Sequence, residues 1–183
     1  MNKHFSLKAS IVIAAVLAVP MAQAGTMTKA EYTATKTRIG ADYKADKAAC
    51  ASQAGNAKDI CVEQAKAKDK VALAELEYAY TGKPSDWNKV QVAKAESAYA
   101  VAKEKCDDQA GNAKDVCVKE AKAVEVKALA DAKLGKKIGE ARKEAADDKR
   151  NADYKVAAEK CDAMVGDAKA SCIAAAKANF GKN

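Results

Sequence analysis

Apolar and small side chains recur every three or four positions along most of the chain, which is the spacing of one face of an α-helix. The clearest run joins Val92, Ala95, Tyr99, Ala102 and Cys106. Two thinner runs have the same spacing: Ile39, Tyr43 and Cys50, and then Cys117, Ala121, Val124 and Ala128. No apolar strand pattern accompanies these runs, so the sequence predicts an all-α protein whose tyrosines pack in the interior.

Tight turns divide the helical pattern into hairpins. Thr28 and Glu31 form a capping box that is expected to start the first helix. Gly55 is placed to end that helix in the left-handed conformation, and Asn56 follows as the predicted N-cap of the returning helix. The same device recurs at Gly111 with Asn112 and at Gly166 with Asp167.

The junctions between hairpins carry signals of unequal strength. The run Gly-Lys-Pro-Ser from Gly82 predicts a stop and a new helix capped by Ser85. The second junction, at 134–139, has two glycines but no proline. It fits either a turn or a kinked continuous helix, and we favour the turn. Trp87 is expected to pack across the first junction, with a surface anchor for a partner as the alternative.

The six cysteines mark three copies of one unit. The two cysteines of a pair are 11 positions apart, and successive pairs begin 56 and then 55 positions apart. The pairs are Cys50 with Cys61, Cys106 with Cys117, and Cys161 with Cys172. The segment Gln53–Asp59 recurs letter for letter as Gln109–Asp115, and a looser copy follows from Met164. Three internal repeats of a helical hairpin account for this spacing.

The first residues have the features of a cleavable secretory signal. Lys3 and Lys8 give a positive start, residues 11–19 form a short apolar run, and Ala22-Gln23-Ala24 is a cleavage motif. The run is too short to span a bilayer, and no later segment is apolar enough to do so. We therefore expect a soluble mature protein that is exported to a bacterial periplasm.

These patterns give a predicted fold and division of the chain. A signal peptide covers residues 1–24, and hairpin repeats cover residues 25–82, 83–137 and 138–183. The prediction is six helices in three antiparallel hairpins, each held by one disulfide. A compact bundle and an extended array both remain open.

The cysteine spacing favours disulfides over metal binding. Cys50 lies five positions before Gly55 and Cys61 six after it, so both stand at about the same height in an antiparallel hairpin. An exported protein meets an oxidising environment, and three level pairs leave no odd thiol. Zinc sites favour closer cysteines and often add histidine, so Cu(I) bound by thiolates is the remaining metal alternative.

Composition limits the core and the chemistry. Alanine contributes about 45 of the 183 residues, whereas the whole chain has 2 phenylalanines and 1 tryptophan. Such a chain is strongly helical but thinly packed, and disulfides stabilise it substantially. The only histidine, His4, lies in the predicted signal, so His-dependent nucleophilic and acid–base catalysis is excluded. We expect no enzyme activity and no cofactor.

The inner motif of the first two repeats carries a resemblance to a known group. Residues 54–62 and 110–118 read A-G-N-A-K-D-[IV]-C-V around a C-x₁₀-C spacing. This resembles exported Ala/Lys-rich proteins of proteobacteria that are often labelled TolA-like cell-envelope proteins. The resemblance covers all three repeats, with the third divergent, and it implies a helical fold and an envelope location but no activity.

Two classes of function fit these expectations. The first is a non-catalytic envelope scaffold, spacer or chaperone-like module that binds another envelope protein through helical faces. The second is a binder of anionic envelope polymers through the lysine-rich segment 136–150, diluted there by four carboxylates. The candidate contacts are Lys136, Lys137, Arg142, Lys143, Lys149 and Arg150. Specific nucleic-acid recognition is not expected, because that segment lacks an aromatic residue for base stacking.

Overall fold

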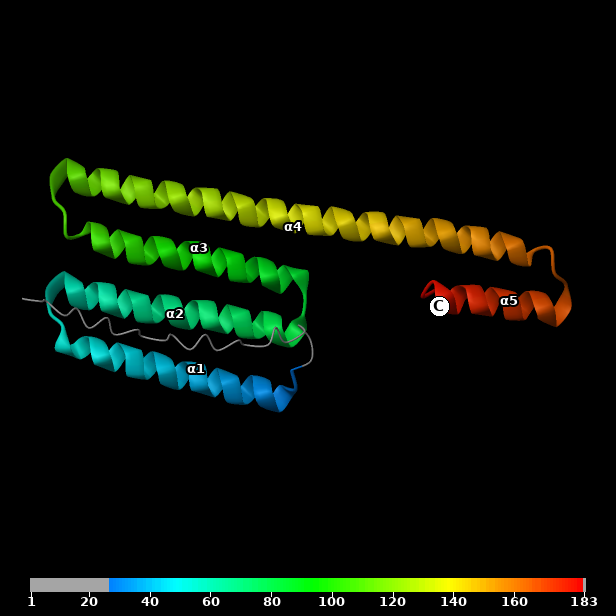
Figure 1. Ribbon diagram of the computed structural model, residues 1–183, viewed down its shortest axis with the longest axis horizontal. Helices are drawn as coiled ribbons and strands as arrows, with labels where there is room; N and C mark the ends of the chain where they lie inside the picture. Colours follow the sequence, from blue (N-terminus) through cyan, green and yellow to red (C-terminus); the bar gives the residue numbers. More distant parts are fainter. Residues whose placement is uncertain (1–26, 183) are drawn as a thin grey trace, which may run out of the picture.

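The computed structural model describes residues 27–182, so the predicted signal peptide lies outside the described residues. Within them the chain forms five α-helices and one short 3₁₀ turn. In order these are α1 (Lys29–Ala49), η1 (Cys50–Ser52), α2 (Gly55–Thr81), α3 (Pro84–Cys106), α4 (Gly111–Cys161) and α5 (Gly166–Asn179). The all-α prediction is confirmed, and consecutive helices run antiparallel (Figure 1).

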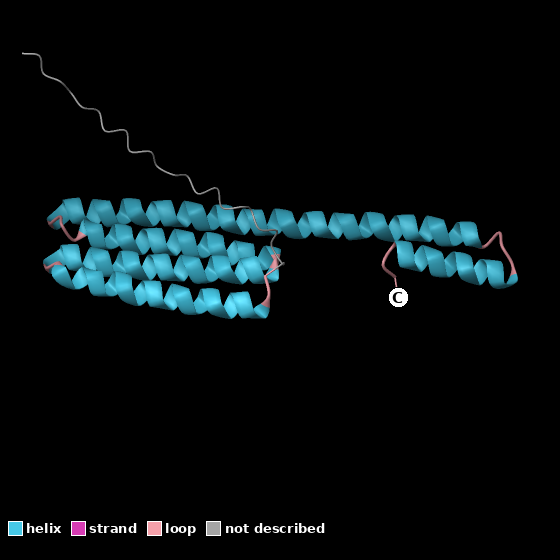
Figure 2. Ribbon diagram, turned by 60° about the horizontal axis from the view of Figure 1, so that its bottom comes forward, coloured by secondary structure: helices cyan, strands magenta, loops and turns pink. Residues whose placement is uncertain are grey.

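The helices are arranged as an open row, not as a closed bundle. Among the described helices, close packing occurs only between neighbours in the chain: α1 with α2, α2 with α3, α3 with α4, and α4 with α5. Figures 1 and 2 show α1, α2, α3 and the first half of α4 side by side, while α5 lies alone beside the far end of α4. The row explains why the interior is thin, since no helix is surrounded on all sides.

α3 is the best-covered helix because it has a long neighbour on each side. Val90 in its second turn is fully buried, and Ala93 and Ala95 are almost so. Ala132 of α4 is buried beside Ala95, on the side of α3 that faces α4. Small side chains at these positions let the helix backbones approach closely, so alanine takes the place of larger core residues.

Specific polar contacts fix the register between neighbouring helices. The ion pair between Lys68 and Asp46, 2.7 Å long, joins α2 to α1. Two more, Lys70 with Glu96 at 2.6 Å and Lys94 with Glu75 at 2.7 Å, join α2 to α3. Exposed pairs of this kind add little stability each. Their consistent placement nevertheless shows that opposite charges face each other along the α2–α3 seam.

The capping prediction is confirmed at the start of α1. The Glu31 amide donates to Thr28 Oγ1 at 3.2 Å, and the Thr28 amide donates to Glu31 at 2.7 Å. The hydrogen bonds that the Thr28 amide and hydroxyl donate to the carboxylate lower the pKa of Glu31. The prediction that Ser85 caps α3 is wrong, because α3 begins at Pro84 with Lys83 as its N-cap. Proline suits that first position, where its missing N–H has no helical partner.

The predicted turn at the second junction is wrong, and with it the count of six helices. α4 runs unbroken through residues 134–139 and across the expected domain boundary at 137/138. At the first junction Gly82 adopts a left-handed φ of 63° and Pro84 starts the next helix. The second junction has no proline, and its two glycines stay helical at a cost of about 1 kcal/mol each. The surrounding lysines, Leu134 and Glu140 favour helix, so the hydrogen-bond ladder continues.

None of the described helices is both long enough and apolar enough to cross a membrane.

Candidate functional site

The three disulfides are confirmed in the predicted pairing. The Cα atoms of each pair lie 5.6, 5.7 and 5.7 Å apart, in chain order, which is the usual separation for a disulfide. The first cysteine of each pair is buried, and the second is half-buried. Each bridge therefore closes the inner side of a hairpin tip, where the helices approach most closely.

The hairpin tips owe their shape to glycine. Gly55, Gly111 and Gly166 have φ values of 56°, 56° and 59°, a left-handed conformation that other residues rarely adopt. In each case the glycine is the first residue of the returning helix. Asn56, predicted to cap α2, does not do so, because the N-cap of α2 is Ala54.

Asn56 instead joins two hairpins. Its Nδ2 donates to the backbone oxygen of Glu104 at 3.0 Å and to Asp108 Oδ1 at 2.8 Å, both at the end of α3. The tips of the first two hairpins lie at the same end of the row, where Asn56 holds them together (Figure 1). Sequence reasoning missed this role because an asparagine after a glycine is also a typical N-cap.

The disulfides bear directly on the Cu(I) alternative. Among the described residues no cysteine is free, so this state offers no thiolate to a soft metal. The described part of the chain also has no group of three or more His, Cys, Asp or Glu side chains that could hold a metal ion.

The candidate polyanion contacts lie on a bare stretch of α4. All six side chains are exposed, and every residue from 133 to 146 is exposed as well. Two of the cations already have carboxylate partners: Lys136 with Glu140 at 3.7 Å and Arg150 with Asp147 at 2.9 Å. At 100° per residue, Lys136, Lys143 and Arg150 lie on one side of the helix, while Arg142 and Lys149 lie on another. The cations therefore do not form a single face.

One groove does gather three cations. Lys136 and Lys143 of α4 line it together with Lys83, which precedes α3, and Pro84 and Ser85 form its opposite wall. Glu140, the partner of Lys136, also lines this groove and offsets one of the three charges. The amides of Asp86 and Trp87 already donate to the backbone oxygen of Lys83, and Pro84 has no N–H, so any preference for negative charge there comes from the lysines. Sequence reasoning missed Lys83, because nothing local links it to residues more than fifty positions later.

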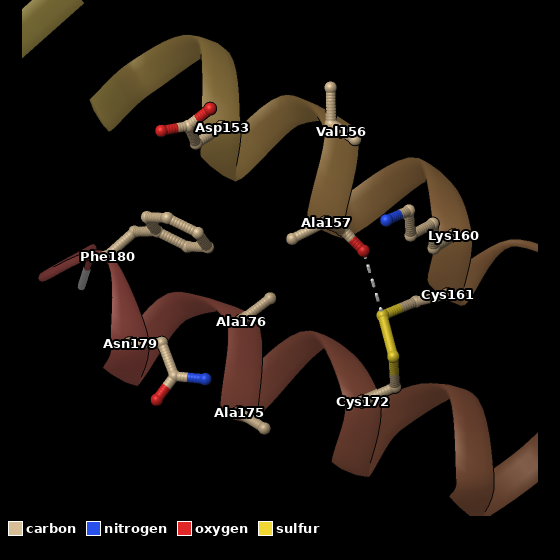
Figure 3. Close-up of a pocket in the computed structure, with 10 residues that line it drawn as sticks. All are labelled: Asp153, Val156, Ala157, Lys160, Cys161, Cys172, Ala175, Ala176, Asn179 and Phe180. Carbon is tan, nitrogen blue, oxygen red and sulfur yellow. Dashed lines mark hydrogen bonds between the residues drawn. A yellow bond between two sulfur atoms is a disulfide. The ribbon is translucent and has the colours of Figure 1, made fainter. Parts of the chain in front are cut away.

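A second groove lies between α4 and α5 beside the third disulfide (Figure 3). It has a volume of about 530 Å³, with Ala157, Ala176 and Phe180 on its walls and Asp153 and Lys160 at its rim. In Figure 3 Phe180 points toward α4, and the Cys161–Cys172 bridge closes one end. Most of its lining is apolar, so it can accommodate an apolar side chain.

The first junction is built around a buried carboxylate that sequence reasoning did not single out. Asp86 is 4% exposed and accepts a 2.6 Å hydrogen bond from Thr81 Oγ1, while Lys89 Nζ lies 2.7 Å from its other oxygen. The hydrogen bond from Lys89 lowers the pKa of Asp86 most, and the hydrogen bond from Thr81 lowers it further. Trp87 packs on Tyr78 with ring centroids 5.1 Å apart, as expected for a residue that bridges the junction.

Comparison with known proteins gives no relative: no protein-family model, curated protein or solved structure matches the chain.

Proposed function

We propose that the protein is a non-catalytic scaffold of the bacterial cell envelope, in which α4 acts as a spacer between two disulfide-bonded ends. One observation carries this proposal. α4 is a single helix of 51 residues, which corresponds to about 75 Å at 1.5 Å per residue. The row of α1, α2 and α3 lies beside its first half, and α5 packs beside its far end (Figure 1). A continuous helix is stiffer than a loop of equal length, so it keeps two binding surfaces apart.

The three disulfides support an extracytoplasmic location. Bridges of this kind persist in oxidising compartments such as the periplasm and are rare in the cytosol. The predicted signal at residues 1–24 and the resemblance to TolA-like envelope proteins lead to the same compartment. Each disulfide also keeps a hairpin tip rigid, which suits a surface that other envelope proteins contact.

A specific observation favours a second candidate, a binder of anionic envelope polymers. Lys83, Lys136 and Lys143 converge on one groove beside the start of α3. Phosphate or carboxylate groups of a polymer would meet these lysines there. Carboxylates within 136–150 weaken this candidate, because Glu140 already pairs with Lys136 and Asp147 already pairs with Arg150.

A pair of variants separates the two candidates. Deleting residues 137–143 removes two turns and shortens α4 by about 10 Å, while the helix faces stay nearly in phase. The matched control keeps the length and changes Lys136, Lys137, Arg142 and Lys143 to Gln. Photo-crosslinkers at Ser52 in the first tip and at Val165, which is 85% exposed in the third, would report contacts at both ends in exporting cells.

A spacer is expected to give complexes that contain a protein adduct at each end of one chain. The deletion should retain each adduct singly but lose the complex that contains both, and the glutamine control should retain it. If the glutamine control loses its contacts while the shortened chain keeps its double complex, the polymer binder is the better description. Adducts at one end only would contradict the spacer.

A further inference from the structure

α4 carries an exposed apolar stripe outside its contact with α3, and the last residue of the stripe, Val156, also borders the groove beside α5. We call it the outer stripe: Val116, Ala123, Leu134, Ile138, Ala145 and Val156. Steps of 4, 7 and 11 positions keep these residues on one side of a helix. The four large side chains are 42–56% exposed. In Figure 3 Val156 points away from α5, and Ala132, on the other side of α4, is buried toward α3. Exposed apolar residues that form one line indicate a contact surface.

The equivalent positions in the earlier repeats are covered by neighbouring helices. Moving back 56 positions from Val116, Ala123 and Leu134 leads to Ile60, Ala67 and Tyr78 of α2, which are half-buried. Moving back 55 positions from Ala145 and Val156 leads to Val90 and Val101 of α3, of which Val90 is fully buried. These residues belong to the two helices that pack on each other as α2 and α3. The two halves of α4 thus correspond to a pair of helices that pack together, yet a continuous helix cannot fold onto itself.

We propose that the outer stripe is the interface of a homodimer, in which α4 of one chain packs antiparallel on α4 of a second copy. The four large residues of the stripe are placed symmetrically about Lys136. Val116 and Val156 each lie 20 positions from it, and Leu134 and Ile138 each lie 2 positions from it. A twofold axis near Lys136 therefore sets Val116 of one chain against Val156 of the other. This is the self-complementary arrangement that twofold dimers require.

Polar residues that flank the stripe match the same arrangement. The α2–α3 seam has the Glu75–Lys94 ion pair, and the corresponding residues of α4 are Asp131 and Lys149. They lie 5 positions before and 13 positions after Lys136, about 27 Å apart along one straight α4, so these opposite charges can pair only between two chains. The bond from Asn56 to Glu104 likewise corresponds to Asn112 and Glu159. No hydrogen bond from the side chain of Asn112 is present within the described chain.

A second copy also covers the bare part of α4. Residues 133–146 are all exposed and include Gly135 and Gly139. An isolated helix of about 12–15 residues is marginal in water, and glycine weakens it further. In the dimer this stretch lies at the centre of the contact. Each end of the assembly then contains six helices in a row, the last two from the other copy, which is the order predicted from the sequence.

The test measures the mass of the oxidised full chain, purified after export, by sedimentation over a concentration series. We expect twice the chain mass for the wild type. Leu134→Glu with Ile138→Glu should raise the dissociation constant at least 100-fold without loss of helix, since both side chains are exposed. Val124→Lys is the matched control. Val124 is 64% exposed on α4, but its counterpart Lys68 faces α1 and not α3, so this variant should remain dimeric.

Crosslinking distinguishes the dimer from a chain that breaks at 134–139 and folds back. Within one straight α4, Val116 and Val156 are about 60 Å apart. A photo-crosslinker at Val116, used in a mixture of ¹⁴N- and ¹⁵N-labelled chains, should give adducts near Val156 that join a light chain to a heavy one. Adducts confined to single chains, or a monomeric mass with no such adduct, would overturn the proposal. Asp131→Lys should weaken the dimer, and Lys149→Asp in the same chain should restore it.

Discussion

Asn56 of α2 donates a 3.0 Å hydrogen bond from Nδ2 to the backbone oxygen of Glu104, which lies 48 positions later at the end of α3. The same amide group donates to Asp108 Oδ1 at 2.8 Å. The last turn of α3 and the loop that follows it thus both accept hydrogen bonds from the first turn of α2. The contact joins two disulfide-bonded tips that share few large apolar side chains.

Replacing Asn56 with Ala is expected to lower the free energy of unfolding by about 1 kcal/mol, since a half-buried bond to a carbonyl is lost. Urea denaturation followed by circular dichroism measures this change. Asn112→Ala is the matched control, because Asn112 occupies the equivalent position in the next repeat and is exposed. At concentrations where the chain is monomeric the control should be close to wild type. Equal losses in both variants would mean that the α2–α3 contact contributes nothing specific.

The third disulfide should matter most for local order. α5 packs only on α4, and its one buried residue is Ala176. Changing Cys161 and Cys172 to Ser removes a constraint of about 3 kcal/mol in the chain-entropy account. We expect α5 to lose protection from hydrogen exchange while α1–α3 keep theirs. In the control, Cys106 and Cys117 to Ser, α3 and α4 should stay largely protected, because α3 packs on two helices. Uniform loss along the chain would instead indicate one cooperative core.

The junction between α2 and α3 should be sensitive to acid. Lys89 and Thr81 lower the pKa of Asp86, so the folded state binds fewer protons than the unfolded state just below the ordinary aspartate pKa. Its contribution is fully present above about pH 4 and is lost as the pH falls through the lowered value. Trp87 is the neighbouring residue and the chain's only tryptophan, so its fluorescence reports unfolding there.

Two variants isolate the contribution of Asp86 in denaturation series from neutral pH to pH 3. Asp86→Asn should be less stable than wild type at neutral pH and should lose part of the acid dependence. Glu31→Gln is the comparison, because the pKa of Glu31 is also lowered but its carboxylate caps the start of α1 instead of joining α2 to α3. The Glu31 variant should leave the acid response of Trp87 unchanged. An Asp86→Asn protein with wild-type acid dependence would show that another group controls this junction.

Local chemistry explains why much of the fold was predictable. A left-handed glycine midway between two cysteines that are 11 positions apart turns the chain so that the two cysteines face each other. Each disulfide could therefore be predicted from its own hairpin alone. The capping box at Thr28 and the stop at Gly82 are local as well. The Ser85 cap failed by two positions, because Lys83 and Pro84 already start the helix.

Features that depend on distant partners were not predictable in the same way. Asn56 carries the same local signal whether it caps α2 or reaches α3, and only the register between helices selects the second role. The conformation at 134–139 depends on two opposing free energies. Keeping two glycines in a helix costs stability, and a turn there would in return let a third hairpin pack on the second. The open row and the groove at Lys83 have no local signal at all.

The lysine-rich part of α4 should bind polyanions only weakly. Each well-placed cation releases about one counterion when it meets a polymer phosphate or sulfate, so six free cations on one face would bind strongly at low salt. Here Lys136 and Arg150 already face carboxylates, and the remaining cations point to different sides of the helix. We expect the protein to elute from heparin below about 0.15 M salt, as a mildly basic protein does. Changing Lys136, Lys137, Arg142 and Lys143 to Gln should shift that elution only slightly.

Lys83→Gln with Lys143→Gln tests the groove beside α3 separately, because Lys83 lies outside the segment but lines the same cavity. Retention well above about 0.3 M, abolished by the groove variant alone, would favour the polymer binder over the scaffold.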